Sequence, residues 1–168
     1  EVLTPELVGD IGVVIQLIVE DGTMRSVVTA GVEAEPSRAT LDCIELREGD
    51  LIHVAASDMT NAHAAAELSE WAAALPPFVT LVVSVSPAVA QVPVEAWETI
   101  FARADVVTMN DWEATTLADV LERNKPGSTI RSYMRPDAAT VRRLGGTGCH
   151  LQVNADAPVV HIPAFEVT

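Results

Sequence analysis

The sequence is poor in cysteine, in basic residues and in long apolar runs. Its two cysteines, Cys43 and Cys149, form no CxxC pair and have no spacing typical of a metal site, so we expect reduced core thiols. No apolar run reaches the ~18 residues of a membrane span, and no charged segment precedes an apolar one at the start. Neither a membrane partner nor export is indicated, and the cytoplasm is the expected compartment.

Acidic residues outnumber basic residues more than two to one. Lys and Arg total 10 against 24 Asp and Glu, which gives a formal net charge of -14 at pH 7. A field of this sign repels phosphate backbones and anionic lipid, so nucleic acid is not an expected partner. An anionic nucleotide would need local help to bind, from helix N-termini, backbone amides or Mg²⁺.

The length and composition are those of one globular domain. The chain has 168 residues, of which 49% are hydrophobic and 20% charged, and this is too apolar for a disordered tail. It begins at Glu1 instead of Met, and it ends at Thr168 in an extended-looking run. We therefore expect an internal segment of a longer protein.

Local patterns predict a β-hairpin followed by alternating strands and helices. Residues 12–20 and 25–29 read as strands and flank Asp21-Gly22, a dipeptide typical of hairpin turns. Beyond residue 50, apolar β-branched runs alternate with segments of helical periodicity. The predicted strands are 51–55, 79–85, 105–109, 141–144, 150–153 and 159–162, and the predicted helices are 61–75, 94–102 and 112–123. This alternation predicts an α/β fold, a mostly parallel sheet with helices on both faces.

Asn110 and Glu113 stand where a predicted strand ends and a helix begins. Ligands of open α/β sheets collect outside the carboxyl ends of the strands, so these polar side chains are expected to face a crevice. An amide and a carboxylate three residues apart can share the first helical turn and meet one phosphate–Mg²⁺ group. The same spacing also describes a capping box, with Asn110 as N-cap and Glu113 as its partner.

A glycine turn, Gly145 to Gly148, follows the strand that ends near Arg143. Glycines allow a backbone to approach a phosphate or adenine closely, and successive amides can form an anion-binding nest. The turn is neither a P-loop nor a dinucleotide fingerprint, because no helix, Lys-Ser/Thr pair or GxGxxG register follows. A plain β-hairpin turn between Leu144 and Cys149 explains the glycines as well.

The remaining candidates are four histidines and one aspartate. The histidines share no metal-ligand spacing, and three of them lie in predicted strands, so each is interpreted as a hydrogen-bonded structural residue. They are His53, His63, His150 and His161. Asp58 follows the strand 51–55 and is expected either to hydrogen-bond a substrate hydroxyl or to cap the helix near Thr60 and Asn61.

Taken in this order, the segments resemble the ribokinase-like, or PfkB, family of sugar and nucleoside kinases. The opening hairpin looks like that family's β-lid, and the strand 102–110 with Glu113 is similar to the strand that ends in the family's Asn-x-x-Glu motif. The segment 141–148 resembles the family's Thr-x-Gly-x-x-Gly element, and the run 161–164 resembles the strand after it. The resemblance implies a three-layer, doubly wound sheet, with residues 1–32 as the lid segment and residues 33–168 as part of the core.

The function that the resemblance implies is ATP-dependent transfer of phosphate to a sugar or nucleoside hydroxyl. Its implied site residues are Asn110 and Glu113 for Mg²⁺ and phosphate, and Gly145 and Gly148 for the nucleotide, to which Arg143 could add a charged donor. Asp58 is the candidate for a substrate hydroxyl because of its position after the strand 51–55. Arg143 replaces the usual Thr of the glycine element, and Ser84-Val85-Ser86-Pro87 stands where the family often has an Asp-x-Asn-Pro-like segment. The acceptor therefore cannot be inferred from the resemblance.

The general base is expected outside these 168 residues. The family's Gly-Ala-Gly-Asp segment, which holds the base and the anion hole, would begin just beyond Thr168. No catalytic residue is therefore assigned within the chain, and no kinase activity is expected from it alone. Glu113 and Asn110 would then support catalysis chiefly by positioning and charge neutralisation.

Two other classes of function stay open. One is a non-catalytic ligand-binding or regulatory domain of the same fold, in which Asn110 and Glu113 serve only as a helix cap. The other is an interaction module, because an exposed β-hairpin is suited to form a homodimer with a second copy.

Overall fold

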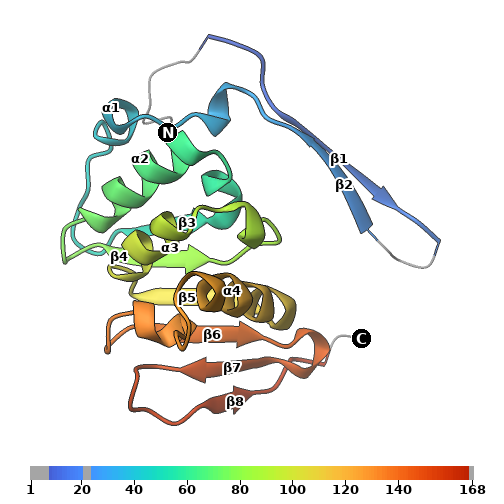
Figure 1. The fold of residues 1–168 in the computed structure, drawn as a ribbon, viewed down its shortest axis with the longest axis vertical. Helices are drawn as coiled ribbons and strands as arrows, with labels where there is room; N and C mark the ends of the chain where they lie inside the picture. The colour runs from blue at the N-terminus through green and yellow to red at the C-terminus, as the bar shows by residue number, and fades with distance from the viewer. Residues whose placement is uncertain (1–7, 21–23, 167–168) are drawn as a thin grey trace.

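A β-hairpin projects from an α/β body in the computed structural model, which describes residues 8–20 and 24–166 (Figure 1). The hairpin pairs β1 (Val13–Ile18) antiparallel with β2 (Met24–Thr29), with Val13 opposite Thr29 and Ile18 opposite Met24. Both strands confirm the prediction, and the Asp21-Gly22 turn lies outside the described residues. Every residue of β1 and β2 is exposed, so the hairpin takes no part in the core.

The body is built on a six-stranded sheet whose strand order follows the chain. Four strands are parallel: β3 (Leu51–Ala55), β4 (Thr80–Ser84), β5 (Val106–Asn110) and β6 (Ala139–Arg143). Two antiparallel strands complete it: β7 (Cys149–Gln152) and β8 (Val160–Ile162). Each predicted strand is present, and β7 is antiparallel to β6 because a tight turn can join only antiparallel neighbours.

Helices connect the parallel strands. The α-helices are α1 (Arg38–Leu41), α2 (Ala62–Ala73), α3 (Val94–Phe101) and α4 (Asp111–Asn124). Single 3₁₀ turns are η1 (Val32–Ala34), η2 (Ala56–Met59), η3 (Val89–Gln91), η4 (Ile130–Tyr133) and η5 (Gly145–Thr147). Helix α1 was not predicted, because four residues are too few to show a helical period. Within the described ranges, no helix combines the length and the apolar character needed to cross a membrane.

Capping and helix-breaking residues determine where α2 begins and ends. The side chain of Asn61 accepts a hydrogen bond from the amide of His63 at 2.8 Å, which satisfies an amide at the helix start. Pro76-Pro77 follows the helix and cannot continue it, because proline has no amide donor. The local sequence therefore determines where this helix begins and ends.

Helices α2, α3 and α4 lie side by side on one face of the sheet (Figure 1). Each parallel strand from β3 to β6 is added on the same side of the one before it. Crossover connections between parallel strands are right-handed, so all the connecting helices pack on the same face of the sheet. The α/β class with a mostly parallel sheet and a hairpin is confirmed. The second helical layer expected from the sequence is not found among the described residues, because the strand order there never reverses.

The core lies between the sheet and this helical layer. Leu81, Val83 and Val107 point into it from β4 and β5 and are fully buried. Trp97 and Phe101 of α3 pack against each other with ring centroids 5.0 Å apart. Side chains of the opposite face stay partly exposed, so the expectation that the strand 79–85 is covered on both faces holds for one face only.

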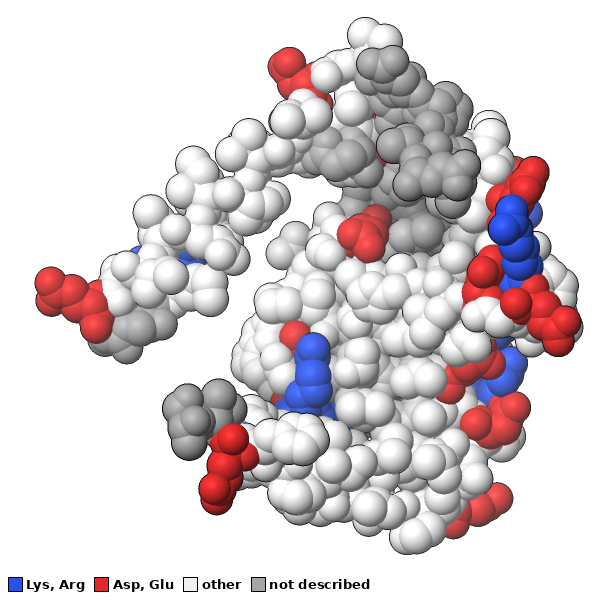
Figure 2. Space-filling model, turned by 180° about the vertical axis from the view of Figure 1, so that it is seen from behind, with Lys and Arg blue, Asp and Glu red and all other residues white. Residues whose placement is uncertain are grey.

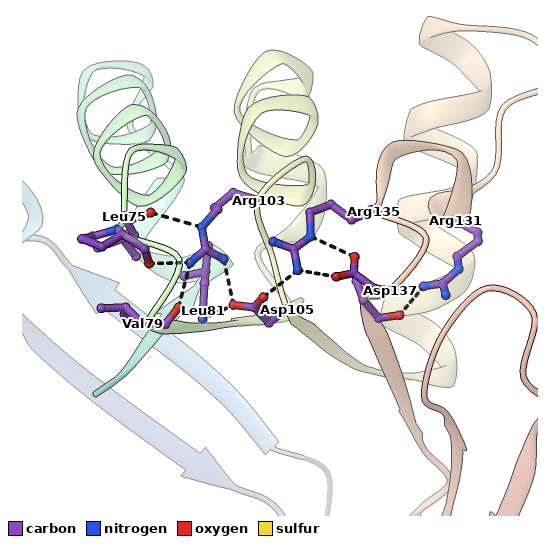
Figure 3. Close-up of polar contacts among 10 residues, drawn as sticks. Leu75, Val79, Leu81, Arg103, Asp105, Arg131, Arg135 and Asp137 are labelled. Atoms are coloured by element: carbon purple, nitrogen blue, oxygen red, sulfur yellow. Dashed lines mark hydrogen bonds and ion pairs between the residues drawn. The ribbon is translucent and has the colours of Figure 1, made fainter. Parts of the chain in front are cut away.

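A network of ion pairs connects neighbouring strands at their amino ends (Figure 3). Asp105 accepts a hydrogen bond from the amide of Leu81 at 2.7 Å and pairs with Arg103 at 2.8 Å and with Arg135 at 2.9 Å. Arg103 also donates to the carbonyl oxygens of Leu75, Pro76 and Val79. Burial by itself would raise the pKa of Asp105, but the Leu81 amide and the two guanidinium groups outweigh it and lower that pKa.

Candidate functional site

Asn110 and Glu113 meet at the carboxyl end of β5, where α4 begins. Asn110 Oδ1 accepts a hydrogen bond from the amide of Glu113 at 2.8 Å, and Glu113 Oε2 accepts one from the amide of Asn110 at 2.8 Å. These two bonds form the capping box that the spacing describes, because they satisfy amides that have no partner within the helix. The box uses only the oxygen of the Asn110 amide, and the NH₂ group remains as a donor.

Arg143 adds a third hydrogen bond to Glu113 from the neighbouring strand β6. Its Nη2 donates to Glu113 Oε2 at 2.8 Å, and the strand register places it beside Asn110. The side chain of Glu113 is 3% exposed, whereas that of Arg143 is 49% exposed. A buried carboxylate is costly without a charged or hydrogen-bonding partner. Arg143 therefore stabilises the charge of Glu113 while half of its own side chain stays at the surface.

Arg142 makes a second link between β6 and the start of α4. Its Nε pairs with Asp111 Oδ1 at 2.5 Å. Successive side chains of a strand point to opposite faces, so Arg142 lies on the helical side and Arg143 on the open side. Neither link was predicted from the sequence, although two acids in the first turn of α4 and two arginines at the end of β6 were a visible signal.

The oxygens of Asn110 and Glu113 that form the cap are not free to coordinate Mg²⁺ directly, and the support of Mg²⁺ and phosphate binding that the resemblance implied for this pair stays a prediction. Mg²⁺ requires oxygen ligands in nearly ideal octahedral geometry. Asn110 Oδ1 and Glu113 Oε2 already accept the bonds that hold the first turn of α4, and the guanidinium group 2.8 Å from Glu113 Oε2 would repel a divalent cation. A Mg²⁺ requirement of the complete reaction stays a prediction.

The glycine turn after β6 contains two kinds of glycine. Gly148 has a φ of 106°, and a Cβ there would lie 2.0 Å from the carbonyl oxygen of Ile162, so the close approach of the chain after β8 requires glycine. Gly145 has a φ of 60°, with no atom within 4 Å of its Cβ position. The hairpin-turn interpretation therefore accounts for Gly148. The backbone at Gly145 has open space beside it, and its role toward a nucleotide stays a prediction.

A cavity of about 910 Å³ lies between the base of the hairpin and β3. Val14 and Val28 line it from the hairpin, and Asp58 and Asn61 line it from the body. The carboxylate of Asp58 accepts a hydrogen bond from the amide of Ala55 at 3.1 Å, so its orientation is set by the turn after β3. Asp58 does not cap α2, whose N-cap is Asn61. Its role toward a substrate stays a prediction.

Figure 2 shows the molecule from the side opposite to the helices. The hairpin stands away from the body, and a hollow separates the two. The face of the sheet below the hollow is largely uncharged, and most acidic side chains in this view lie along the outer margin. An anionic ligand at this face therefore avoids most of the acidic surface that the net charge of -14 implies.

Three of the histidines, His53, His150 and His161, contact other side chains. His53 Nε2 lies 2.7 Å from Ser84 Oγ on the open face of the sheet, and the rings of His150 and His161 meet edge to face at 5.4 Å. Among residues 8–20 and 24–166, no cluster of three His, Cys, Asp or Glu side chains could hold a metal ion. The expectation of two core thiols was wrong, because Cys43 is exposed and Cys149 is only half-buried.

No protein-family model matches the sequence, and no curated protein matches it. Solved structures do match the fold. A sugar kinase of Pyrococcus horikoshii in complex with ATP has a TM-score of 0.66 and 13% identity, over 94% of this chain and 50% of that one. Ribokinase of Thermotoga maritima has a TM-score of 0.61 and 19% identity, over 93% and 49%. A nucleoside kinase of Burkholderia thailandensis in complex with inosine has a TM-score of 0.62 and 15% identity, over 94% and 47%.

The chain has a ribokinase-like fold, as the order of its motifs suggested. It spans about half the length of these solved structures. Sequence identities between 13% and 19% establish the shared fold, and one fold can host different functions. The function depends on the residues at the carboxyl edge of the sheet and around the cavity.

Proposed function

We propose that the protein containing this chain transfers the γ-phosphoryl group of ATP to a hydroxyl group of a sugar or nucleoside. The ribokinase-like fold supports the proposal, because its solved examples include a sugar kinase in complex with ATP and a nucleoside kinase in complex with inosine. The observation that carries it is the grouping of Asn110, Arg143 and Gly145 at one edge of the sheet, at the start of α4.

The phosphate groups would lie against hydrogen-bond donors at this edge. The first turn of α4 presents the positive end of a 14-residue helix, which favours anions. The NH₂ group of Asn110 and the exposed part of Arg143 add side-chain donors, and the open backbone at Gly145 allows close approach. Local donors of this kind are needed because the net charge of -14 otherwise opposes a nucleotide.

The acceptor would occupy the cavity between the hairpin and β3. Its volume of about 910 Å³ lies in the range of small-molecule pockets. Asp58 and Asn61 offer polar groups to hydroxyls, while Val14 and Val28 offer apolar surface from the hairpin. In this proposal the hairpin excludes water from the acceptor, so that phosphate passes to the acceptor instead of to water.

Transfer would proceed by in-line attack of the acceptor oxygen on the γ-phosphorus. The new oxygen–phosphorus bond forms as the bond to the β–γ bridging oxygen of ATP breaks, and ADP leaves. The hydroxyl proton passes to a general base that the proposal places in the rest of the protein, because no residue of this chain is assigned that role. The chain would contribute positioning and charge neutralisation, on which phosphoryl transfer chiefly depends.

We also propose that a second copy of the chain covers the outer face of the hairpin. Val14 and Val28 face the cavity, so by strand alternation Val13, Ile15 and Val27 face away from it. These three outward side chains are 50–55% exposed. Apolar surface of this kind marks an interaction site, and a two-fold interface can bury the same patch on both copies.

Calorimetry with ADP tests the proposed nucleotide site. Asn110→Ser should keep the helix cap, since Ser and Asn cap equally well, but it removes the NH₂ donor. We expect the wild-type protein to bind ADP and the variant to bind it about tenfold more weakly, which corresponds to one hydrogen bond to a charged group. Unfolding of both proteins by urea is the control for the cap. Unchanged ADP affinity in the variant would favour the cap-only, regulatory alternative.

A further inference from the structure

We propose that Arg143 is the resident cation of the phosphate site, and that nucleotide binding by this protein therefore depends little on Mg²⁺. This inference rests on the proposed nucleotide site and concerns how the charge of that site is balanced. Its basis is the contact of Arg143 with Glu113, the carboxylate that the resemblance would assign to a metal–phosphate group.

The charges at the start of α4 are already paired within the chain. Its first turn carries two acids, Asp111 and Glu113, and β6 supplies one arginine to each of them. A carboxylate that faced a phosphate without a cation between them would repel it. The guanidinium group of Arg143 forms an ion pair with Glu113, and the Arg143 side chain is half exposed. Arg143 can therefore contact the carboxylate and an incoming phosphate at the same time.

The geometry of the guanidinium group suits this double role. Arg143 uses one terminal nitrogen, Nη2, for Glu113. A guanidinium group has five N–H donors in a planar fork that matches carboxylate and phosphate oxygens, so further donors remain for an anion. Among the described residues, Glu113 is the partner that the Arg143 side chain contacts.

The position of Arg143 directs these remaining donors to the proposed nucleotide site. It lies beside Asn110 in the strand register and directly precedes the glycine turn that contains Gly145. Arg142 is the matched contrast, because it pairs with Asp111 and lines the cleft between α4 and η4 on the helical side. The two arginines are neighbours in the chain and are similarly exposed, but they lie on opposite faces of the sheet.

A purely structural role is the alternative explanation for the contact. In that case Arg143 would only fasten the start of α4 to β6, as Arg142 does. The two roles make different predictions about Mg²⁺, because a fastening residue affects folding stability but leaves the metal dependence of ADP affinity unchanged.

The experiment is calorimetric titration of the protein with ADP, once with excess Mg²⁺ and once with EDTA. We expect the wild-type affinity to differ by less than about threefold between the two conditions, below the usual range of coupling between two ligands. Arg143→Thr should bind ADP about tenfold or more weakly in EDTA, with Mg²⁺ restoring part of the loss. Arg143→Lys keeps a positive charge and should stay insensitive to Mg²⁺, and Arg142→Thr should behave as the wild type.

Three outcomes would overturn the inference. If wild-type affinity rises about tenfold or more with Mg²⁺, Arg143 does not replace the metal, although the proposed nucleotide site stands. If Arg143→Thr shows the same response to Mg²⁺ as the wild type, the contact is only structural. If ADP fails to bind in either condition, the proposed function fails together with the inference. Thermal unfolding shows whether Arg143→Thr is folded. If it is not, the wild-type and Arg143→Lys titrations decide whether ADP affinity depends on Mg²⁺.

Discussion

Arg135 Nη2 lies 2.9 Å from Asp105 Oδ1, and this ion pair joins the loop before β6 to the amino end of β5. The other carboxylate oxygen of Asp105 pairs with Arg103 and accepts a hydrogen bond from the amide of Leu81 in β4 (Figure 3). One carboxylate therefore connects three neighbouring strands at the sheet edge opposite to the proposed nucleotide site. Its role is to hold the strands that position that site.

Replacement of Asp105 by Asn should destabilise the fold. The variant removes the charge that faces Arg103 and Arg135, which are 12% and 35% exposed. Arg103 is left without its carboxylate partner, whereas Arg135 keeps its ion pair with Asp137. We expect a loss of about 1–3 kcal/mol in the free energy of unfolding, measured by urea denaturation. Asp137→Asn is the matched control, since this aspartate is 73% exposed, and it should change stability by less than about 0.5 kcal/mol. Equal losses in both variants would contradict the prediction.

The same carboxylate predicts an acid-dependent loss of stability. The pKa of Asp105 is lowered in the folded protein, so the unfolded chain binds its proton at a higher pH than the folded chain does. The resulting stabilisation is complete above the ordinary carboxyl pKa, about 4, and is lost as the pH falls through the lower folded-state value. Urea unfolding across this range should show the wild type losing its advantage over Asp105→Asn. A constant difference at all pH values would exclude this contribution.

The two glycines of the turn after β6 should respond differently to alanine. Gly148→Ala places a Cβ against the backbone at Ile162 and forces a backbone conformation that is essentially restricted to glycine, so we expect a loss of at least about 2 kcal/mol. Gly145→Ala meets open space and should cost only about 1 kcal/mol for its left-handed backbone. Thermal unfolding measures both effects. Equal destabilisation would mean that β8 does not approach Gly148 as described.

Self-association through the hairpin can be tested with one charge on each of its faces. Ile15→Lys places a charge on the outward face beside Val13 and Val27, whereas Gln16→Lys places it on the cavity side. We expect the wild type and Gln16→Lys to form dimers, and Ile15→Lys to shift the dimer to monomer by about tenfold or more in dissociation constant, because a buried unpaired charge is costly. Light scattering over a range of concentrations measures this. A wild-type monomer at every concentration would contradict the proposal.

The order of secondary structure could be predicted from the sequence because its signals are local. Strand periodicity, the proline pair after α2 and the Asn110–Glu113 spacing each depend on residues a few positions apart. The capping box was therefore one of the two interpretations available before the structure. The choice between a cap and a ligand site required the surroundings of Glu113.

The tertiary structure decided the contacts that join distant segments. Arg143 meets Glu113 across 30 positions of the chain, and Asp105 meets Arg135 across 30, so both pairs depend on the register of neighbouring strands. The single helical layer likewise depends on strand order, which no local pattern encodes. The sequence by itself determined which segments become strands and helices, because backbone preference and capping act over a few residues. Which charges meet at the edge of the sheet was decided only when packing brought those segments together.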